Sequence, residues 1–135
     1  MTKIFAATIT AGVMAISAMA QPTVTANIPF AFYVGDMKLP AGSYEIETVR
    51  PQVLRIKNAS THNVAAAFNP VPITRPEAPG RPGRLVFYRY GVSYFLSEMW
   101  PAGSSTGRLV PRSDFQLELA RKTLPIRIES LTVSR

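Results

Sequence analysis

Cysteine is absent from this 135-residue chain, and histidine and tryptophan occur once each. The absence of cysteine excludes a disulfide framework, a thiolate metal site, a cysteine nucleophile and a lipid-modified cysteine. The single histidine, His62, occurs in a turn-like Thr-His-Asn sequence, and only Asp36 and Asp114 could serve as the aspartate of a serine triad. Neither a Gly-x-Ser-x-Gly motif nor a phosphate-binding glycine loop is present. We therefore expect a protein that is not an enzyme and that holds no metal and no cofactor.

The first twenty residues carry little charge and have the form of a secretory signal peptide. Lys3 supplies the positive charge, residues 4–19 are apolar and rich in alanine, and Ala18-Met19-Ala20 provides a small-x-small cleavage site. Threonine, serine and glycine within the stretch argue against a transmembrane anchor. We predict a cleaved leader over residues 1–20 and a single all-β domain over residues 21–135. We expect that domain to be periplasmic or extracellular, and not integral to the membrane after cleavage.

Acidic residues are in the minority, because eight Asp and Glu face fifteen Lys and Arg, eleven of which are arginine. Removing Lys3 with the leader leaves 14 basic and 8 acidic residues, a net charge of +6. Such a balance raises the affinity for polyanions. Since export separates the chain from nucleic acid, we expect no nucleic acid partner. The expected partner is a cell-envelope protein, a polysaccharide or an anionic surface, and charges spread over a soluble face are the alternative.

Alternation of apolar and polar residues predicts β-strands along most of the chain. The predicted strands cover residues 23–34, 43–50, 53–57 and 64–68, both arms of 85–100, a brief piece at 109–111, and 125–133. Ser113 and Gln116 resemble a capping box and predict a helix over residues 114–122, with Phe115, Leu117 and Leu119 as its apolar contacts. These elements predict an all-β antiparallel sandwich or small barrel of about seven or eight strands with one short C-terminal helix.

The strongest strand signal lies in residues 85–100, where two aromatic and β-branched runs meet at Gly91. This pattern predicts a central β-hairpin with a positive φ at the glycine. We expect a three-residue loop over residues 90–92, which would place Phe87 opposite Phe95.

Two finer expectations concern the strands before the hairpin. Pro29 cannot donate a ladder hydrogen bond, so it predicts an edge position or a bulge in the first strand. Glu45 and Glu47 lie on one face of their strand, and we expect them to pair with Arg55 and Lys57 on the next.

Candidate binding residues come from two places. Residues 69–83 hold five prolines, which exclude a regular strand or helix and predict a long surface loop flanked by arginines. The hairpin adds aromatic rings that are suited to stacking on sugar rings or on a partner. The candidates are Arg75, Arg81, Arg84, Tyr88, Arg89, Tyr90, Tyr94 and Trp100. A passive connector and rings buried in the core are the alternatives.

Three short motifs span most of residues 21–135: Phe32-Tyr-Val-Gly35, Leu39-Pro-Ala-Gly-Ser-Tyr44 and Leu85-Val-Phe-Tyr-Arg-Tyr-Gly91. With them the chain resembles a group of small, exported, uncharacterised bacterial β-proteins. The resemblance implies a shared β-fold and export. Its motifs are typical of turns and cores, so it implies no activity and no catalytic residues.

The sequence therefore predicts a non-enzymatic exported β-domain that is a binding or interaction module at the cell envelope. A small barrel around an apolar ligand is the first alternative, which an interior cavity lined by Phe, Tyr and Leu would distinguish. An enzyme of unrecognised type is the second alternative. It would need a pocket that unites His62 with Asp36, Glu98 or Arg89.

Overall fold

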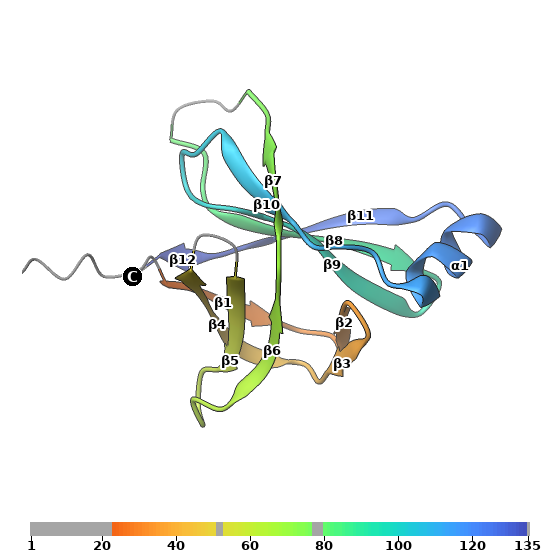
Figure 1. Ribbon diagram of the computed structural model, residues 1–135, viewed down its shortest axis with the longest axis horizontal. Helices are drawn as coiled ribbons and strands as arrows, with labels where there is room; N and C mark the ends of the chain where they lie inside the picture. The colour runs from red at the N-terminus through yellow and green to blue at the C-terminus, as the bar shows by residue number, and fades with distance from the viewer. Residues whose placement is uncertain (1–22, 51–52, 77–79, 135) are drawn as a thin grey trace, which may run out of the picture.

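The computed structural model describes residues 23–50, 53–76 and 80–134, so the predicted leader lies outside the described residues. Within these ranges the chain forms twelve strands and one helix (Figure 1). The strands are β1 (Thr23–Ile28), β2 (Phe32–Val34), β3 (Met37–Leu39), β4 (Gly42–Arg50), β5 (Val53–Asn58), β6 (Val64–Phe68), β7 (Val71–Thr74), β8 (Arg84–Tyr90), β9 (Ser93–Trp100), β10 (Thr106–Leu109), β11 (Ile126–Leu131) and β12 (Val133–Ser134). The helix is α1 (Asp114–Lys122), with the predicted bounds.

The strands form two sheets, which we call the first and the second sheet. The first has the order β12-β1-β4-β5-β6, and the second has the order β11-β8-β9-β10-β7. The β2–β3 hairpin joins the second sheet where Tyr33 pairs in parallel with Phe95. The predicted all-β, sandwich-like fold with one helix is confirmed. The strands outnumber the predicted total of about seven or eight, because two predicted strands divide between the sheets and β3 and β7 form where turns or loops were expected.

Continuous stretches of chain connect the two sheets at two corners. β6 runs through Asn69 and Pro70 into β7, and β11 runs through Thr132 into β12 (Figure 1). Each of these stretches pairs with one sheet over its first half and with the other sheet over its second half. Strands that change sheet at a bend are typical of sheets that pack at a large angle.

Pro29 marks a change of sheet and neither an edge nor a bulge. β1 ends at Ile28 in the first sheet, and β2 begins at Phe32 beside the second. The apolar alternation nevertheless continues, because Ala26, Ile28 and Phe32 all face the core between the sheets. The prediction of one strand over residues 23–34 was therefore wrong, since the alternation reports burial and not the identity of the sheet.

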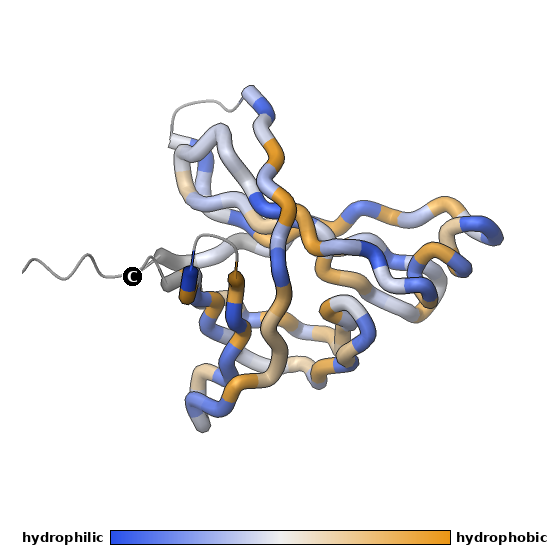
Figure 2. Tube along the Cα trace, in the orientation of Figure 1, coloured by the Kyte–Doolittle hydropathy of each residue, from blue (hydrophilic) through white to orange (hydrophobic). Residues whose placement is uncertain are grey.

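The core lies between the two sheets and draws side chains from both. Phe32 packs edge-to-face against Tyr44 of the first sheet and Phe87 of the second, with ring centroids 5.4 and 5.6 Å apart. The Tyr44 hydroxyl donates a hydrogen bond to the Pro40 carbonyl at 2.6 Å, which closes the turn into β4. Figure 2 shows the alternation of hydrophobic and hydrophilic residues along the strands around this core.

The β8–β9 hairpin has a two-residue turn and not the predicted three-residue loop. Tyr90 pairs with Ser93, so Gly91 and Val92 form the turn, and φ at Gly91 is +62° as predicted in sign. Phe87 therefore pairs with Leu96 and not with Phe95. A short primed turn fits the twist of the strands, and glycine takes its positive φ without strain.

A β-bulge in β9 then reverses the side-chain alternation. Phe87 pairs with Leu96, but the next pair is Val86 with Glu98, so Ser97 is the extra residue. Without the bulge Glu98 would face the core beside Leu85. With it, Glu98 and Trp100 lie on the same side of the second sheet as Val86 and Arg84, away from the core. We call this side the outer face of the second sheet.

Helix α1 begins as predicted but packs differently. The Ser113 hydroxyl accepts a hydrogen bond from the Gln116 backbone N–H at 3.2 Å. The buried residue of the helix is Gln116, whereas Phe115 and Leu117 are exposed. Phe115 still reaches the ring of Phe95, with centroids 5.7 Å apart. The helix therefore covers the end of the outer face beside the hairpin turn, with a mixed rather than an apolar stripe.

On the outward face of β4 and β5, the predicted cross-strand ion pairs form at Glu47, whereas the carboxylate of Glu45 lies near His62. Glu45 pairs with Lys57 in register, and Glu47 pairs with Arg55. The Glu47 carboxylate lies 2.7 Å from both the Arg55 and the Lys57 nitrogens. The pKa of Glu47 is therefore below its ordinary value, because Lys57 and Arg55 bond to the charged form of its carboxylate.

This lowered pKa gives the first sheet a predictable acid sensitivity. The pKa is lower in the folded than in the unfolded chain, so the stabilisation is complete above the ordinary value of 4.5 and is lost as the pH falls through the folded value. We expect the free energy of unfolding, measured by urea melts, to fall further between about pH 6 and pH 3 for the wild type than for Glu47→Gln, by up to about 1 kcal/mol per ion pair. Parallel pH profiles of the two proteins would contradict this account.

Candidate functional site

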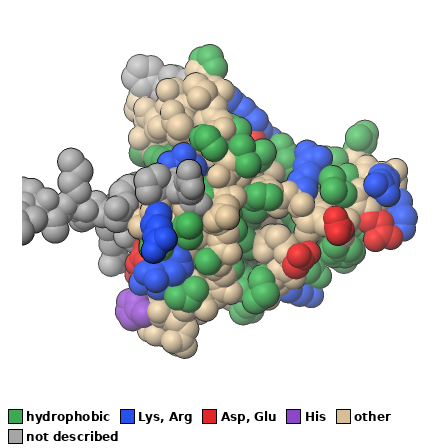
Figure 3. All heavy atoms as spheres, viewed as in Figure 1, with side chains coloured by type: hydrophobic (Ala, Val, Ile, Leu, Met, Phe, Trp, Pro, Cys, Tyr) green, Lys and Arg blue, Asp and Glu red, His purple; other side chains and the backbone are tan. Residues whose placement is uncertain are grey.

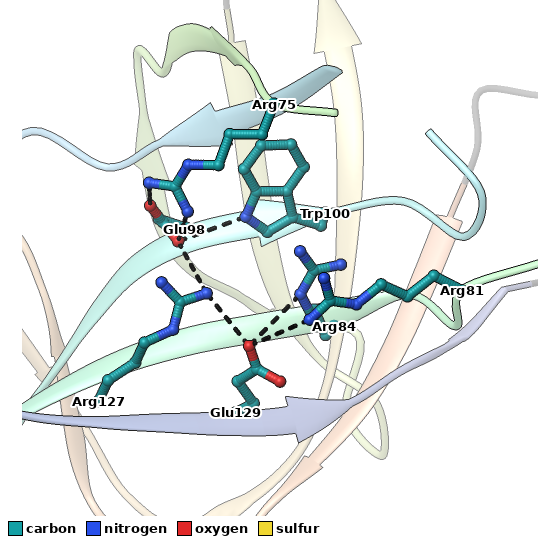
Figure 4. Close-up of polar contacts among 7 residues, drawn as sticks. All are labelled: Arg75, Arg81, Arg84, Glu98, Trp100, Arg127 and Glu129. Carbon is teal, nitrogen blue, oxygen red and sulfur yellow. Dashed lines mark hydrogen bonds and ion pairs between the residues drawn. The ribbon is translucent and has the colours of Figure 1, made fainter. Parts of the chain in front are cut away.

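A buried carboxylate on β9 anchors the most polar part of the outer face. Glu98 is 1% exposed, and Arg75 donates hydrogen bonds to both of its oxygens, at 2.5 Å from Nη2 and 3.3 Å from Nη1. The indole N–H of Trp100 donates a third at 3.3 Å, and an Arg127 nitrogen lies 3.7 Å away (Figure 4). Burying a carboxylate is costly unless it is paired and hydrogen-bonded. Glu98 meets both conditions.

A second carboxylate, Glu129 of β11, extends the network. Nitrogens of Arg127, Arg81 and Arg84 lie 3.1, 3.5 and 3.6 Å from one of its oxygens (Figure 4). Arg127 therefore connects the two glutamates. Burial alone would lower the pKa of Arg127, but its hydrogen bond to Glu129 and the charges of Glu98 and Glu129 raise it above its ordinary value. Arg127 is therefore a cation at neutral pH.

The ring of Trp100 packs against two arginines of this network. Its ring is fully buried, with the Arg75 guanidinium 5.3 Å and the Arg84 guanidinium 5.2 Å from its centroid. Arginine over an indole ring gains a cation–π attraction. We use the name arginine cluster for the seven residues Arg75, Arg81, Arg84, Glu98, Trp100, Arg127 and Glu129.

The arginine cluster is held by backbone contacts at the described ends of the proline-rich segment. The Arg75 N–H donates to the Ser105 carbonyl at 2.9 Å, and the Arg81 carbonyl accepts from the Gly103 N–H at 2.8 Å. Contrary to the prediction, this segment contains a strand, β7, which pairs with β10. Its Pro72 is tolerated because β7 lies at the sheet edge, where a strand has ladder partners on one side only. Residues 77–79 of the predicted loop lie outside the described residues.

The arginine cluster carries excess positive charge at the surface. Its four arginines and two glutamates leave a net charge of +2. The side chains of Arg75, Arg81 and Arg127 are 44%, 42% and 40% exposed, while Arg84 is buried beneath them. The planar guanidinium fork matches carboxylate, phosphate and sulfate oxygens. The arrangement is therefore chemically suited to holding an anionic group at the surface of the second sheet.

The remaining predicted site residues lie outside the arginine cluster. Tyr90 is buried against Phe95, with ring centroids 5.7 Å apart, and Tyr88 is half-buried. Tyr94 stacks on Phe30 at 3.9 Å on the core side of the sheet, and the Arg89 guanidinium lies 6.0 Å from the Tyr94 ring. The structure thus unites four of the eight predicted residues, Arg75, Arg81, Arg84 and Trp100. The hairpin tyrosines pack within the protein.

Three members of the arginine cluster were not among the predicted site residues: Glu98, Arg127 and Glu129. The sequence does contain a signal for Glu98, a lone carboxylate inside the aromatic run of β9. A charge in an otherwise buried strand requires a partner of opposite sign. Arg127 and Glu129 have no such local signal, because only the pairing of β11 with β8 brings them to this face.

The lone histidine lies elsewhere. His62 is in the turn after β5 with φ +59°, and its Nδ1 is 3.9 Å from a Glu45 oxygen on the first sheet. Glu98 and Arg89 belong to the second sheet. Among the described residues no three His, Asp or Glu side chains are grouped to hold a metal ion, and no helix is both long and apolar enough to cross a membrane.

Comparisons of the chain with protein-family models, with curated proteins and with solved structures find no match. Function therefore has to be inferred from the geometry of the arginine cluster.

Proposed function

We propose that the protein is an exported, non-enzymatic binding module of the cell envelope whose arginine cluster holds anionic groups of a polysaccharide or other anionic surface. The observation that carries the proposal is that two glutamates hold four arginines in place. Three of the four arginine side chains are nevertheless about two-fifths exposed. The leader-like composition of residues 1–20 and the net positive charge support export and an anionic partner.

The network lowers the cost of binding. A free arginine side chain loses rotamer entropy when it binds a ligand. Here Glu98 and Trp100 already hold Arg75, and Glu129 holds Arg81 and Arg127. Preorganised donors of this kind bind more tightly than mobile ones. A single site of net charge +2 binds one small anion weakly. A repeating polyanion is a better partner, because when one of its groups leaves the site another group of the same polymer is close enough to replace it.

The module is better supported than a carrier of an apolar ligand. Between the sheets, side chains such as Phe32, Tyr44, Leu85 and Phe87 pack together into a single core cluster. The Lys and Arg side chains on the face drawn in Figure 3 lie in several separate patches, so general surface charge is the main competing explanation for any polyanion affinity. The test therefore has to separate the arginine cluster from the rest of the surface charge.

The only tryptophan lies within the arginine cluster, so its fluorescence reports on binding there. We expect polygalacturonate, but not neutral dextran, to change the emission of the purified exported protein, with weakening as salt is added. Arg81→Gln should weaken binding about tenfold, as expected for one charged hydrogen bond. Arg50→Gln removes the same charge from the first sheet and should leave the affinity within about twofold.

Two outcomes would overturn the proposal. Equal weakening by Arg81→Gln and Arg50→Gln would show that net charge alone attracts the polymer. No binding of polygalacturonate, of an anionic lipid vesicle or of a sulfated polymer would show that the network only stabilises the fold.

A further inference from the structure

Strand β11 leaves an open edge on the second sheet. It pairs with β8 along its whole length, from Ile126 opposite Arg89 to Leu131 opposite Arg84. In the described part of the chain no strand pairs with its other edge, and Figure 1 shows that edge facing outward along the half nearest α1. Leu124 and Ile126 at this end are 89% and 52% exposed. An open edge with exposed apolar residues is a template for pairing with another strand.

The charges on β11 favour one partner, a second copy of the same strand. A two-fold axis perpendicular to the sheet would pair two copies antiparallel and keep each side chain on its own face. Only residues of the same face can then be opposite one another. Centring the pair on Arg127 would oppose two arginines, and centring it on Glu129 would oppose two glutamates. Centring it on Ile128 places Arg127 opposite the partner's Glu129, and Glu129 opposite the partner's Arg127, which is favourable on both sides of the axis.

We propose that the protein forms a two-fold dimer in which the β11 strands pair edge to edge, centred on Ile128. The two second sheets become one continuous sheet of twice the width. Both arginine clusters lie on the same face of it, because the axis is perpendicular to the sheet. The dimer does not depend on the proposed anion binding, although two clusters on one face would suit an extended polyanion better than one.

Charge reversal gives a sharp test by sedimentation equilibrium of the exported protein. Arg127→Glu places two glutamates opposite each other at each end of the pair, and Glu129→Arg places two arginines there. We expect each variant alone to dimerise at least tenfold more weakly than the wild type. We expect an equal mixture of the two to recover dimers, because each mixed pair restores Arg opposite Glu. Damage within either protomer would not be repaired by mixing.

Cross-linking tests the register independently, since the chain has no cysteine of its own. Directly opposite residues of antiparallel strands have Cα atoms about 4.5–5.5 Å apart, within disulfide range. Ile128→Cys should therefore form a covalent dimer under mild oxidation. Ser130→Cys should not, because it lies opposite the partner's Ile126.

The proposal is overturned if the wild type stays monomeric at concentrations of about 100 μM, where even a weak dimer populates. It is also overturned if both charge-reversed variants still dimerise, or if Ser130→Cys cross-links and Ile128→Cys does not. Glu118→Arg, an exposed charge reversal on α1, is the control and should leave dimerisation unchanged.

Discussion

Replacing Glu98 with glutamine is expected to lower the free energy of unfolding by about 3 kcal/mol. Glutamine keeps the size of the side chain but removes the charge that Arg75 and Arg127 share, and it turns one oxygen into a donor that faces other donors. Removing one partner from a buried ion pair leaves the other charge uncompensated. Arg75 is partly exposed, so the lower end of the usual range applies.

Urea unfolding followed by the fluorescence of Trp100 measures this effect at its source, because the indole N–H bonds to Glu98. Glu118→Gln is the matched control. Its carboxylate is 63% exposed and lies 3.7 Å from Lys122 one helical turn away. Such a surface pair contributes less than about 1 kcal/mol. Similar losses for the two variants would mean that Glu98 is not the electrostatic anchor of the arginine cluster.

Replacing Gly107 with alanine is expected to cost about 2 kcal/mol, because β10 passes directly over the Trp100 ring. A Cβ at this position would lie 2.7 Å from two indole carbons and 2.9 Å from a third. The indole cannot swing away, since it is fully buried between Arg75 and Arg84. Either β10 or the ring has to shift, and a shift of the ring also disturbs its bond to Glu98.

Gly42→Ala is the control for this substitution. It also replaces a glycine within a strand, but the new Cβ would only touch a Tyr44 ring carbon at 3.8 Å, an ordinary contact. We expect its free energy of unfolding to stay within about 0.5 kcal/mol of the wild type. A comparable loss in thermal and urea melts of both variants would show that glycine itself, and not the Trp100 contact, sets the cost.

Most of the features that were predicted correctly depend on residues that are close together in the sequence. The cap at Ser113, the bounds of α1 and the positive φ of Gly91 each follow from chemistry within a few residues, and all were predicted. The charge ladder of β4 and β5 was predicted for the same reason, because a short turn sets which residues are neighbours. These features need no knowledge of the distant chain.

The errors come from features that depend on distant parts of the chain. The bulge at Ser97 has no signature in the alternation of β9, yet it decides that Glu98 leaves the core. The strand β7 forms in a proline-rich segment because β10 supplies its partner from across the sheet. Arg127 and Glu129 join the arginine cluster through pairing with β8. The members of the arginine cluster from the proline-rich segment and from the hairpin strands, four of the seven, were therefore predicted. Arg127 and Glu129 could not be, and Glu98 was overlooked although a carboxylate inside an aromatic strand is a local signal.

The pairing of β1 with β12 has a consequence for how the chain reaches this fold. Val24 lies opposite Ser134, so strands from the two ends of the described chain are neighbours at one edge of the first sheet. Contacts of such sequence separation form slowly, because a long loop has to close before they are gained. β1 can pair with β4 early, whereas it can pair with β12 only after the chain has been made as far as Ser134. Addition of β12 to the first sheet is therefore a late event, and until then that edge of β1 lacks its partner strand.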